Sequence, residues 1–166
     1  MEPTPKSVDM NAYLPVLTDL AAQGNTVSLT VTGNSMSPFL VHGRDRICLQ
    51  KPEGPLKRGD MALFRRRNGV YVMHRVCRAD PDGTCYLVGD GQRDVEGPIP
   101  PEQVLGLVVR VCRKGRWLGP ENLLWRFFAG PWLGLRPLRP LLCRAYGRIS
   151  RLWRKGGGAP HGTEAS

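Results

Sequence analysis

The chain has 166 residues and a formal net charge of +10, a length that suits one domain with an appendage and argues against two full domains. Its content of 41% hydrophobic and 23% charged residues is close to the globular average, which argues against wholesale disorder. The sequence contains no run of about 18 apolar residues and therefore predicts no transmembrane helix. The N-terminal residues lack a basic leader with an apolar core, so we expect no secretory signal and a cytoplasmic or peripherally membrane-associated protein.

The positive charge is concentrated in one part of the chain. Residues 1–109 contain 12 basic and 12 acidic side chains and are neutral overall. Residues 110–155 contain 12 basic side chains, one acidic side chain and all four tryptophans. The sequence therefore predicts a body at 1–113 that is neutral as far as residue 109, a basic aromatic extension at 114–155 and a disordered tail at 156–166.

Cysteine usage indicates the redox state of the protein. The five cysteines are odd in number, scattered, and form no C-x-x-C pair. We therefore expect reduced thiols, with no disulfide framework, no metal site and no cofactor.

The first elements in chain order are a helix and a strand. Apolar residues from Met10 to Ala22 recur at helical spacing with Gly24 as a stop, and Pro15 predicts a late start or a kink. A strand is then predicted over Thr26–Thr32, and a single helical turn over Ser35–Val41.

Short strands follow and favour a mainly β domain. They are predicted at Asp45–Gln50, Asp60–Arg66, Val70–Cys77, Thr84–Val88 and Val104–Val111. Asn68-Gly69 is the best hairpin signal, whereas Gly91–Pro101, with three prolines and two glycines, is expected to be irregular. Short strands with close turns predict an antiparallel β domain built of hairpins, preceded by the N-terminal helix.

Ser35 is the first candidate for chemistry. It follows a predicted strand and lies between Gly33 and Pro38, on a stiff turn that exposes its hydroxyl. The same pattern is also typical of an ordinary turn serine or of a helix N-cap.

His74 and Asp90 are further polar candidates. Strand alternation puts His74 on the same face as Val72 and Val76, where desolvation favours the neutral imidazole that a general base requires. A buried structural histidine would show the same pattern. Asp90 follows the strand that ends at Val88, in a turn where aspartate is common.

The order of these residues is more specific than any one of them. The chain contains Gly-Asn-Ser-Met-Ser-Pro at 33–38, Leu-Lys-Arg-Gly-Asp-Met-Ala-Leu-Phe at 56–64, His-Arg-Val at 74–76 and Gly-Asp at 89–90. This series resembles the LexA/signal-peptidase superfamily, and most closely the signal peptidase I-like serine peptidases. The resemblance covers residues 33–111. It implies the mainly β fold of that superfamily and a serine endopeptidase that cleaves a peptide or precursor protein.

The resemblance also implies roles for the candidates. Ser35 matches the nucleophile, and His74 matches the general base of the histidine-type branch. Many bacterial signal peptidases have a lysine there, but this chain has no lysine in 58–113. Gly33 stands where the lysine branch often has a serine, so the oxyanion would depend on backbone N–H groups, chiefly that of Ser35.

The sequence does not decide which acidic residue completes the catalytic site. Asp90 matches the Gly-Asp box and is the first choice. In the histidine-type branch a later acidic residue is often assigned to the triad, and Asp94 and Glu96 are the alternatives here.

Two other functions remain as alternatives to the serine peptidase, which is the first hypothesis. A LexA-type self-cleaving regulator usually has a DNA-binding domain and an Ala-Gly or Cys-Gly site before its nucleophile. Here 34 residues precede Ser35, and the only Ala-Gly pair, Ala129-Gly130, follows it. The third hypothesis is a catalytically inactive adaptor that binds a membrane or a partner through the extension.

The extension itself predicts a surface contact. Between Leu138 and Leu152 apolar residues follow one helical face, with arginines mainly outside it. This pattern is typical of a basic amphipathic helix on an anionic membrane surface, to which we assign residues 117–155. Packing on the body is the alternative, and nucleic-acid binding is disfavoured because no binding motif accompanies the charge.

Overall fold

A computed structural model describes residues 10–142, 144 and 145, with side chains from Tyr13 onward. The first helix is α1 (Met10–Ala22). The strands are β1 (Val27–Thr30), β2 (Arg46–Gln50), β3 (Met61–Arg65), β4 (Tyr71–Ala79), β5 (Cys85–Val88), β6 (Glu96–Ile99), β7 (Val104–Arg113) and β8 (Arg116–Leu118). Two short helices follow, α2 (Leu123–Ala129) and α3 (Pro131–Gly134), with 3₁₀ turns at Pro101–Gln103 and Arg136–Leu138. Helical residues continue at 139–142 and 144–145.

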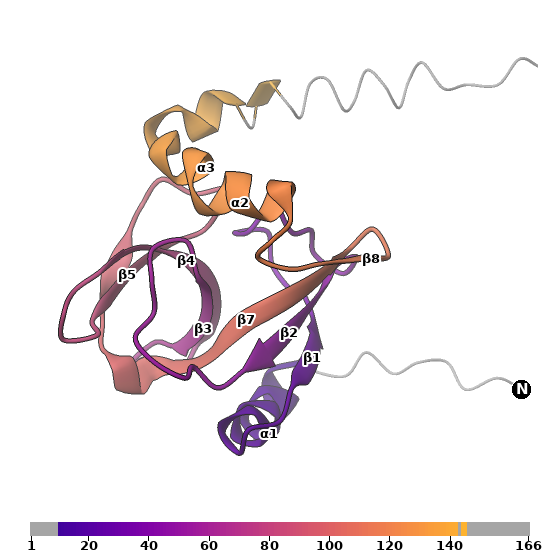
Figure 1. Ribbon diagram of the computed structural model, residues 1–166, viewed down its shortest axis with the longest axis vertical. Helices are drawn as coiled ribbons and strands as arrows, with labels where there is room; N and C mark the ends of the chain where they lie inside the picture. Colours follow the sequence, from indigo (N-terminus) through magenta and orange to yellow (C-terminus); the bar gives the residue numbers. More distant parts are fainter. Residues whose placement is uncertain (1–9, 143, 146–166) are drawn as a thin grey trace, which may run out of the picture.

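All eight strands belong to one antiparallel sheet that curls strongly through β3, β4 and β5 (Figure 1). The strand order is β1-β2-β7-β3-β4-β5-β6, and β8 pairs with β7. The β3–β4 hairpin turns at Asn68-Gly69 as predicted, with Gly69 at φ +86°, a conformation that glycine adopts without a steric penalty. The predicted mainly β fold with an N-terminal helix and a short C-terminal helical region is therefore confirmed.

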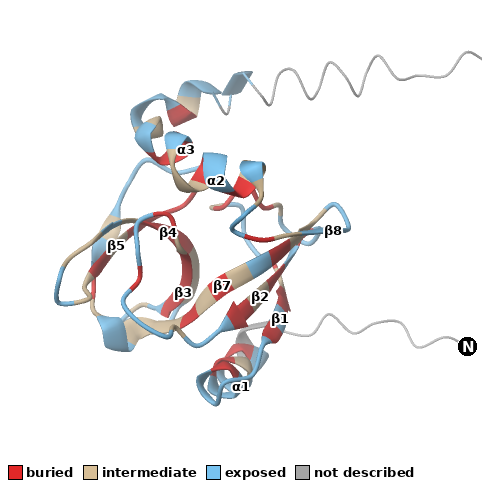
Figure 2. Cartoon of the chain, viewed as in Figure 1, coloured by how far each residue is buried: buried red, intermediate tan, exposed pale blue. Residues whose placement is uncertain are grey.

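Two apolar clusters lie on the two faces of the sheet. One joins α1, β1 and β2 to the segment Met36–Leu40 and to aromatic residues of α2 and α3. The other lies inside the curl of β3, β4, β5 and β6 and includes Phe64 and Val76. Figure 2 shows buried residues along the strands and on the sides of α2 and α3 that face the sheet. Because β4 contributes to both clusters, its successive side chains enter different environments.

Three local predictions are corrected or sharpened. Gly91–Pro101 was expected to be irregular, but it contains β6. This strand is at the edge of the sheet, where Pro98 costs no ladder hydrogen bond on its open side. The predicted helical turn at Ser35–Val41 is a series of turns with one helix-like bond, from Leu40 N–H to the carbonyl of Met36 (2.9 Å). Helix α1 contains Pro15 within its bounds and does not start late.

The C-terminal helices pack against the body. Phe39 of the Ser35 turn contacts Trp125 and Phe128, with ring centroids 6.0 and 4.8 Å apart. The predicted helix at 138–152 is seen only in part, because residue 143 and residues 146–166 lie outside the described chain, as does the predicted disordered tail. In the described ranges, no helix combines the length and the apolar character needed to cross a bilayer.

Candidate active site

His74 lies in the middle of β4 and faces the second apolar cluster. It pairs with Ala62 of β3, and its ring centroid is 6.0 Å from that of Phe64. His74 is only 3% exposed, and Val76 on the same face is fully buried. His74 is therefore buried on one face with Val76, as strand alternation predicts, whereas Val70 is exposed and lies outside β4.

A carboxylate lies beside this buried imidazole. Glu96 Oε2 is 3.6 Å from His74 Nδ1, and Nδ1 has no hydrogen-bond partner within the described residues. Glu96 is the first residue of β6, whose pairing with β5 carries it to the curl. Arg66, directly after β3, donates from Nε and Nη2 to the two oxygens of Glu96, the second bond being 2.7 Å long. The three side chains form a row, with the histidine at its buried end.

Burial controls the protonation of His74. Loss of solvation lowers the His74 pKa from 6.5 to about 4, Glu96 opposes this change, and Arg66 adds to it. The imidazole is therefore neutral at neutral pH and can accept a proton.

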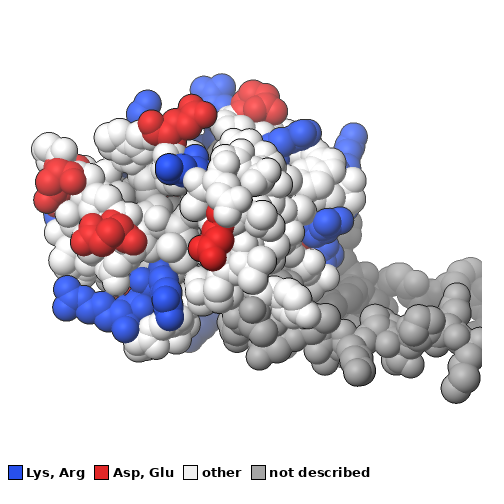
Figure 3. All heavy atoms as spheres, turned by 90° about the horizontal axis from the view of Figure 1, so that it is seen from below, with Lys and Arg blue, Asp and Glu red and all other residues white. Residues whose placement is uncertain are grey.

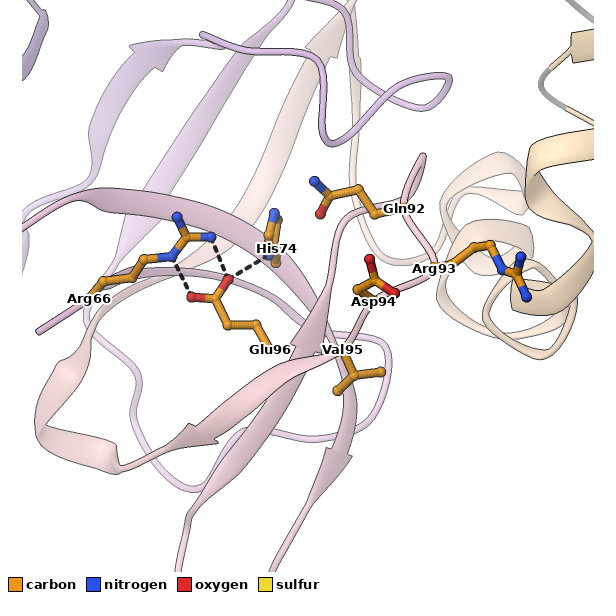
Figure 4. A pocket seen from close by; sticks show the side chains of 7 residues that line it. All are labelled: Arg66, His74, Gln92, Arg93, Asp94, Val95 and Glu96. Carbon is orange, nitrogen blue, oxygen red and sulfur yellow. Dashed lines mark hydrogen bonds and ion pairs between the residues drawn. The ribbon is translucent and has the colours of Figure 1, made fainter. Parts of the chain in front are cut away.

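His74 borders an open cavity of about 500 Å³. Its lining residues are Arg66, His74, Gln92, Arg93, Asp94, Val95 and Glu96. In Figure 4, Glu96 and Arg66 lie on one side of the imidazole and Gln92 lies on the other. His74, Glu96 and Gln92 therefore line the same cavity.

Ser35 lies on the turn between β1 and β2 and is half-buried. Gly91 N–H donates to the carbonyl oxygen of Ser35 at 2.9 Å, and a Cβ at Gly89 would lie 2.5 Å from that same oxygen. The loop Gly89–Gln92 can approach the serine turn this closely because it has no side chain at Gly89. The backbone N–H of Ser35 donates to no acceptor within the described chain.

Ser35 and His74 are brought to the same region without direct contact. Arg75, the neighbour of His74, pairs with Val88, which immediately precedes Gly89. Ser35 is not among the residues lining the His74 cavity, and across the described residues no hydrogen bond joins its hydroxyl to the imidazole. Direct proton transfer between them requires the turn or the serine side chain to move.

Asp90 is engaged elsewhere. Its Oδ1 and Oδ2 accept from Arg75 Nε and Nη2 at 2.9 and 2.8 Å, and both side chains are fully buried. Arg75 also donates to the carbonyl of Gly59 and lies over the ring of Phe39. Strand alternation places Arg75 on the face opposite His74, so the structure brings Glu96, and not Asp90, to the imidazole.

The two remaining predicted residues, Asp94 and Gly33, make no hydrogen bond or ion pair with His74 in the described part of the chain. Asp94 is exposed and lines the cavity, but within the described chain it makes no ion pair or hydrogen bond. The backbone N–H of Gly33 donates to His42 Nδ1 at 3.0 Å, so it is already engaged. Among described residues no group of three His, Cys, Asp or Glu side chains is placed to hold a metal ion.

Sequence reasoning missed several residues that shape the site. Arg66 and Arg75 pair with the two acidic residues, and only Arg75 carries a sequence signal, its place in the His-Arg-Val box. Trp132 and Arg139, far along the chain, bond the carbonyls of the Gly89–Gln92 loop. No spacing rule indicates contacts across more than 40 residues.

No protein-family model and no curated protein matches the chain. Functional inference therefore depends on the residues and on their geometry.

Proposed function

We propose that the protein is a serine endopeptidase of the signal-peptidase type, which cleaves a peptide or precursor protein with Ser35 as nucleophile and His74 as general base. The observation that carries the proposal is the buried imidazole of His74, held beside Glu96 at the edge of an open cavity. The ordered resemblance at 33–38, 56–64, 74–76 and 89–90 supports it independently.

The proton transfers follow from this arrangement. With Glu96 on the Nδ1 side, neutral His74 carries its proton on Nδ1 and accepts the Ser35 proton at Nε2. The Ser35 oxygen forms a bond to the scissile carbonyl carbon, and the unengaged N–H of Ser35 stabilises the resulting oxyanion. His74 then protonates the leaving amine, and water hydrolyses the acyl-enzyme by the same route.

Substrate binding must complete this geometry. A turn held by glycine contacts at Gly89 and Gly91, with a free hydroxyl and a free backbone N–H at Ser35, can present both groups to a bound peptide. Catalytic hydrogen bonds are often formed only in the substrate complex. Glu96 orients the imidazole and stabilises its cation after proton transfer.

The proposal is tested by digestion of a peptide library with the full chain, with cleavages identified by mass spectrometry. We expect Ser35→Ala to lower the rate by about 10³-fold or more, because no other hydroxyl replaces the nucleophile. Ser37→Ala, a change two residues along the same turn, is the matched control and should retain most of the activity. Equal activity of Ser35→Ala and the unaltered protein would overturn the proposal.

Two other outcomes identify the competing functions. Spontaneous cleavage of the chain upstream of Ser35, seen by intact mass, indicates a self-cleaving regulator. Complete lack of hydrolysis together with strong vesicle binding indicates an adaptor. The Ala129-Gly130 bond lies between α2 and α3, where Gly130 N–H is bonded to the carbonyl of Arg126 (3.0 Å), and this position disfavours it as a cleavage site.

We further propose that the C-terminal segment contacts an anionic membrane surface. Leu123 and Leu141 are 79% and 64% exposed, and Phe127 of α2 also faces solvent. Trp125 and Trp132, in contrast, are buried against the body and cannot serve as interfacial anchors. The face drawn in Figure 3, on the α1 side, has acidic and basic side chains interspersed, so the excess charge of the extension is the better attraction for anionic lipid.

Vesicle co-sedimentation tests this partner. The double variant Leu123→Ser with Phe127→Ser should bind vesicles of anionic phospholipid several-fold more weakly, because buried apolar area drives interfacial binding. Val16→Ser on α1, an exposed apolar residue outside the segment, is the matched control. Unchanged binding of the double variant would exclude this surface.

A further inference from the structure

The loop Gly89–Gln92 connects the two halves of the proposed site. At its start it contacts the Ser35 turn through Gly89 and Gly91. Four residues after its end, the chain reaches Glu96 beside His74. A displacement of this loop would therefore shift both Ser35, the proposed nucleophile, and Glu96, the carboxylate beside His74.

The body holds the loop through one side chain. The carboxylate of Asp90 is bound by both arms of the Arg75 guanidinium, in a fully buried pair. This bond anchors the side chain of Asp90 but leaves the backbone carbonyls of the loop to other partners.

The C-terminal segment occupies those carbonyls. Arg139 Nη1 donates to the carbonyls of Gly89 and Gln92 at 2.8 and 3.0 Å, and Trp132 Nε1 donates to that of Asp90 at 2.7 Å. Three of the four loop carbonyls are thus bound by side chains more than 40 residues downstream.

The two donors are fixed to one another. Arg139 is fully buried and also donates from Nε and Nη2 to the carbonyl of Trp132, at 3.3 and 3.1 Å. Its guanidinium carbon lies 5.7 Å from the Trp132 ring centroid. A planar guanidinium can donate to several carbonyls in fixed directions, which an ammonium group cannot reproduce.

We propose that Arg139 and Trp132 are positioning residues of the peptidase site: they hold the loop Gly89–Gln92, and through it the Ser35 turn, in the geometry that catalysis needs. The proposal rests on the function proposed above. The buried residues of the C-terminal segment, Trp132 and Arg139, thus have a role in the site. This role is separate from the membrane contact proposed for the exposed residues Leu123 and Phe127.

The test compares Arg139→Gln and Trp132→Phe with Arg126→Gln, a control at an exposed arginine of α2. Trp132→Phe keeps an aromatic ring but removes the indole N–H together with part of the buried ring system, so it provides a second, uncharged variant if Arg139→Gln folds poorly. We expect Arg139→Gln and Trp132→Phe each to lower kcat about tenfold or more and to change KM by no more than about twofold. The reason is that a small displacement of the reacting groups lowers the rate of the chemical step more than it weakens substrate binding. The control should keep the kcat of the unaltered protein.

Amide hydrogen exchange separates this role from general stability, and it does not depend on activity. Gly91 N–H, bonded to Ser35, should exchange several-fold faster in both variants, whereas Gly83 N–H in the β4–β5 turn should be unchanged. If the unaltered protein hydrolyses no peptide, the proposed peptidase function is wrong. Faster exchange at Gly91 but not at Gly83 would even then show that Arg139 and Trp132 hold the loop Gly89–Gln92 against the Ser35 turn. Equal acceleration at Gly83 and Gly91, or unchanged exchange at Gly91, would overturn the proposal.

Discussion

Two bidentate arginine–carboxylate pairs lie on opposite faces of β4, and they differ in burial and in what else the carboxylate faces. The Arg75–Asp90 pair is fully buried, and both oxygens of Asp90 accept from the Arg75 guanidinium. The Arg66–Glu96 pair borders the cavity, with side chains 40% and 23% exposed, and Glu96 also faces His74. A saturated buried carboxylate stabilises structure, whereas a partly exposed one beside an imidazole can stabilise a charge that appears during a reaction.

The largest effect should come from breaking the buried pair. Asp90→Asn leaves the Arg75 charge uncompensated in the core, which typically costs about 3–5 kcal/mol of the free energy of unfolding. Chemical denaturation measures this loss. Asp94→Asn, an exposed carboxylate four residues away, should change it by less than about 0.5 kcal/mol. If Asp90→Asn keeps full stability but loses all hydrolysis, Asp90 would instead be the acidic residue of the catalytic triad.

Altering the other pair should affect rate and leave stability nearly intact. We expect Glu96→Gln to lower kcat about 10²-fold, equal to about 2.7 kcal/mol of transition-state stabilisation, because the imidazolium loses its counter-charge. The free energy of unfolding should fall by less than about 1 kcal/mol, since the Arg66–Glu96 pair is partly solvated. Steady-state kinetics on a cleavable peptide decides this, with Glu102→Gln, an exposed carboxylate that does not line the cavity, as control. Full activity of Glu96→Gln would remove Glu96 from the mechanism.

The smallest effect is a shift of the pH profile. Because His74 has a pKa of about 4, kcat/KM should fall only as the pH drops through about 4, well below the ordinary histidine value of 6.5. Glu96 raises this pKa and Arg66 lowers it, so Glu96→Gln should move the acidic limb to lower pH and Arg66→Gln should move it to higher pH. An acidic limb near 6.5 in the unaltered protein would contradict the burial of the catalytic base.

Much of the fold could be predicted because short-range patterns determine it. Alternation and turn residues located most strands and the Asn68-Gly69 hairpin. β6 was missed because Gly97 and Pro98 disfavour a central strand, whereas an edge strand accepts them. Periodicity from Leu138 to Leu152 indicated an apolar face but could not say what covers it, and the structure leaves Leu138, Leu141 and Leu142 exposed. Trp125 and Trp132, which lie before this face, are buried against the body.

The site was predictable only in part, for the same physical reason. The burial of His74 followed from local alternation along β4. The neighbours of Asp90 and Glu96 depend on loop geometry and on strand pairing, which spacing along the chain does not specify. The contacts of Arg139 and Trp132 depend on tertiary packing alone. Whether Ser35 acts with His74 stays a prediction.

The most direct test of the central claim is covalent labelling of Ser35. The full chain and its Ser35→Ala and His74→Asn variants would be treated with a serine-reactive fluorophosphonate, and the labelled peptide would be mapped by mass spectrometry. We predict a single modification on Ser35, absent in Ser35→Ala and strongly reduced in His74→Asn, because the hydroxyl needs the imidazole as its base. Labelling of Ser35 that is equally fast without His74, or no labelling of Ser35 at all, would contradict the account.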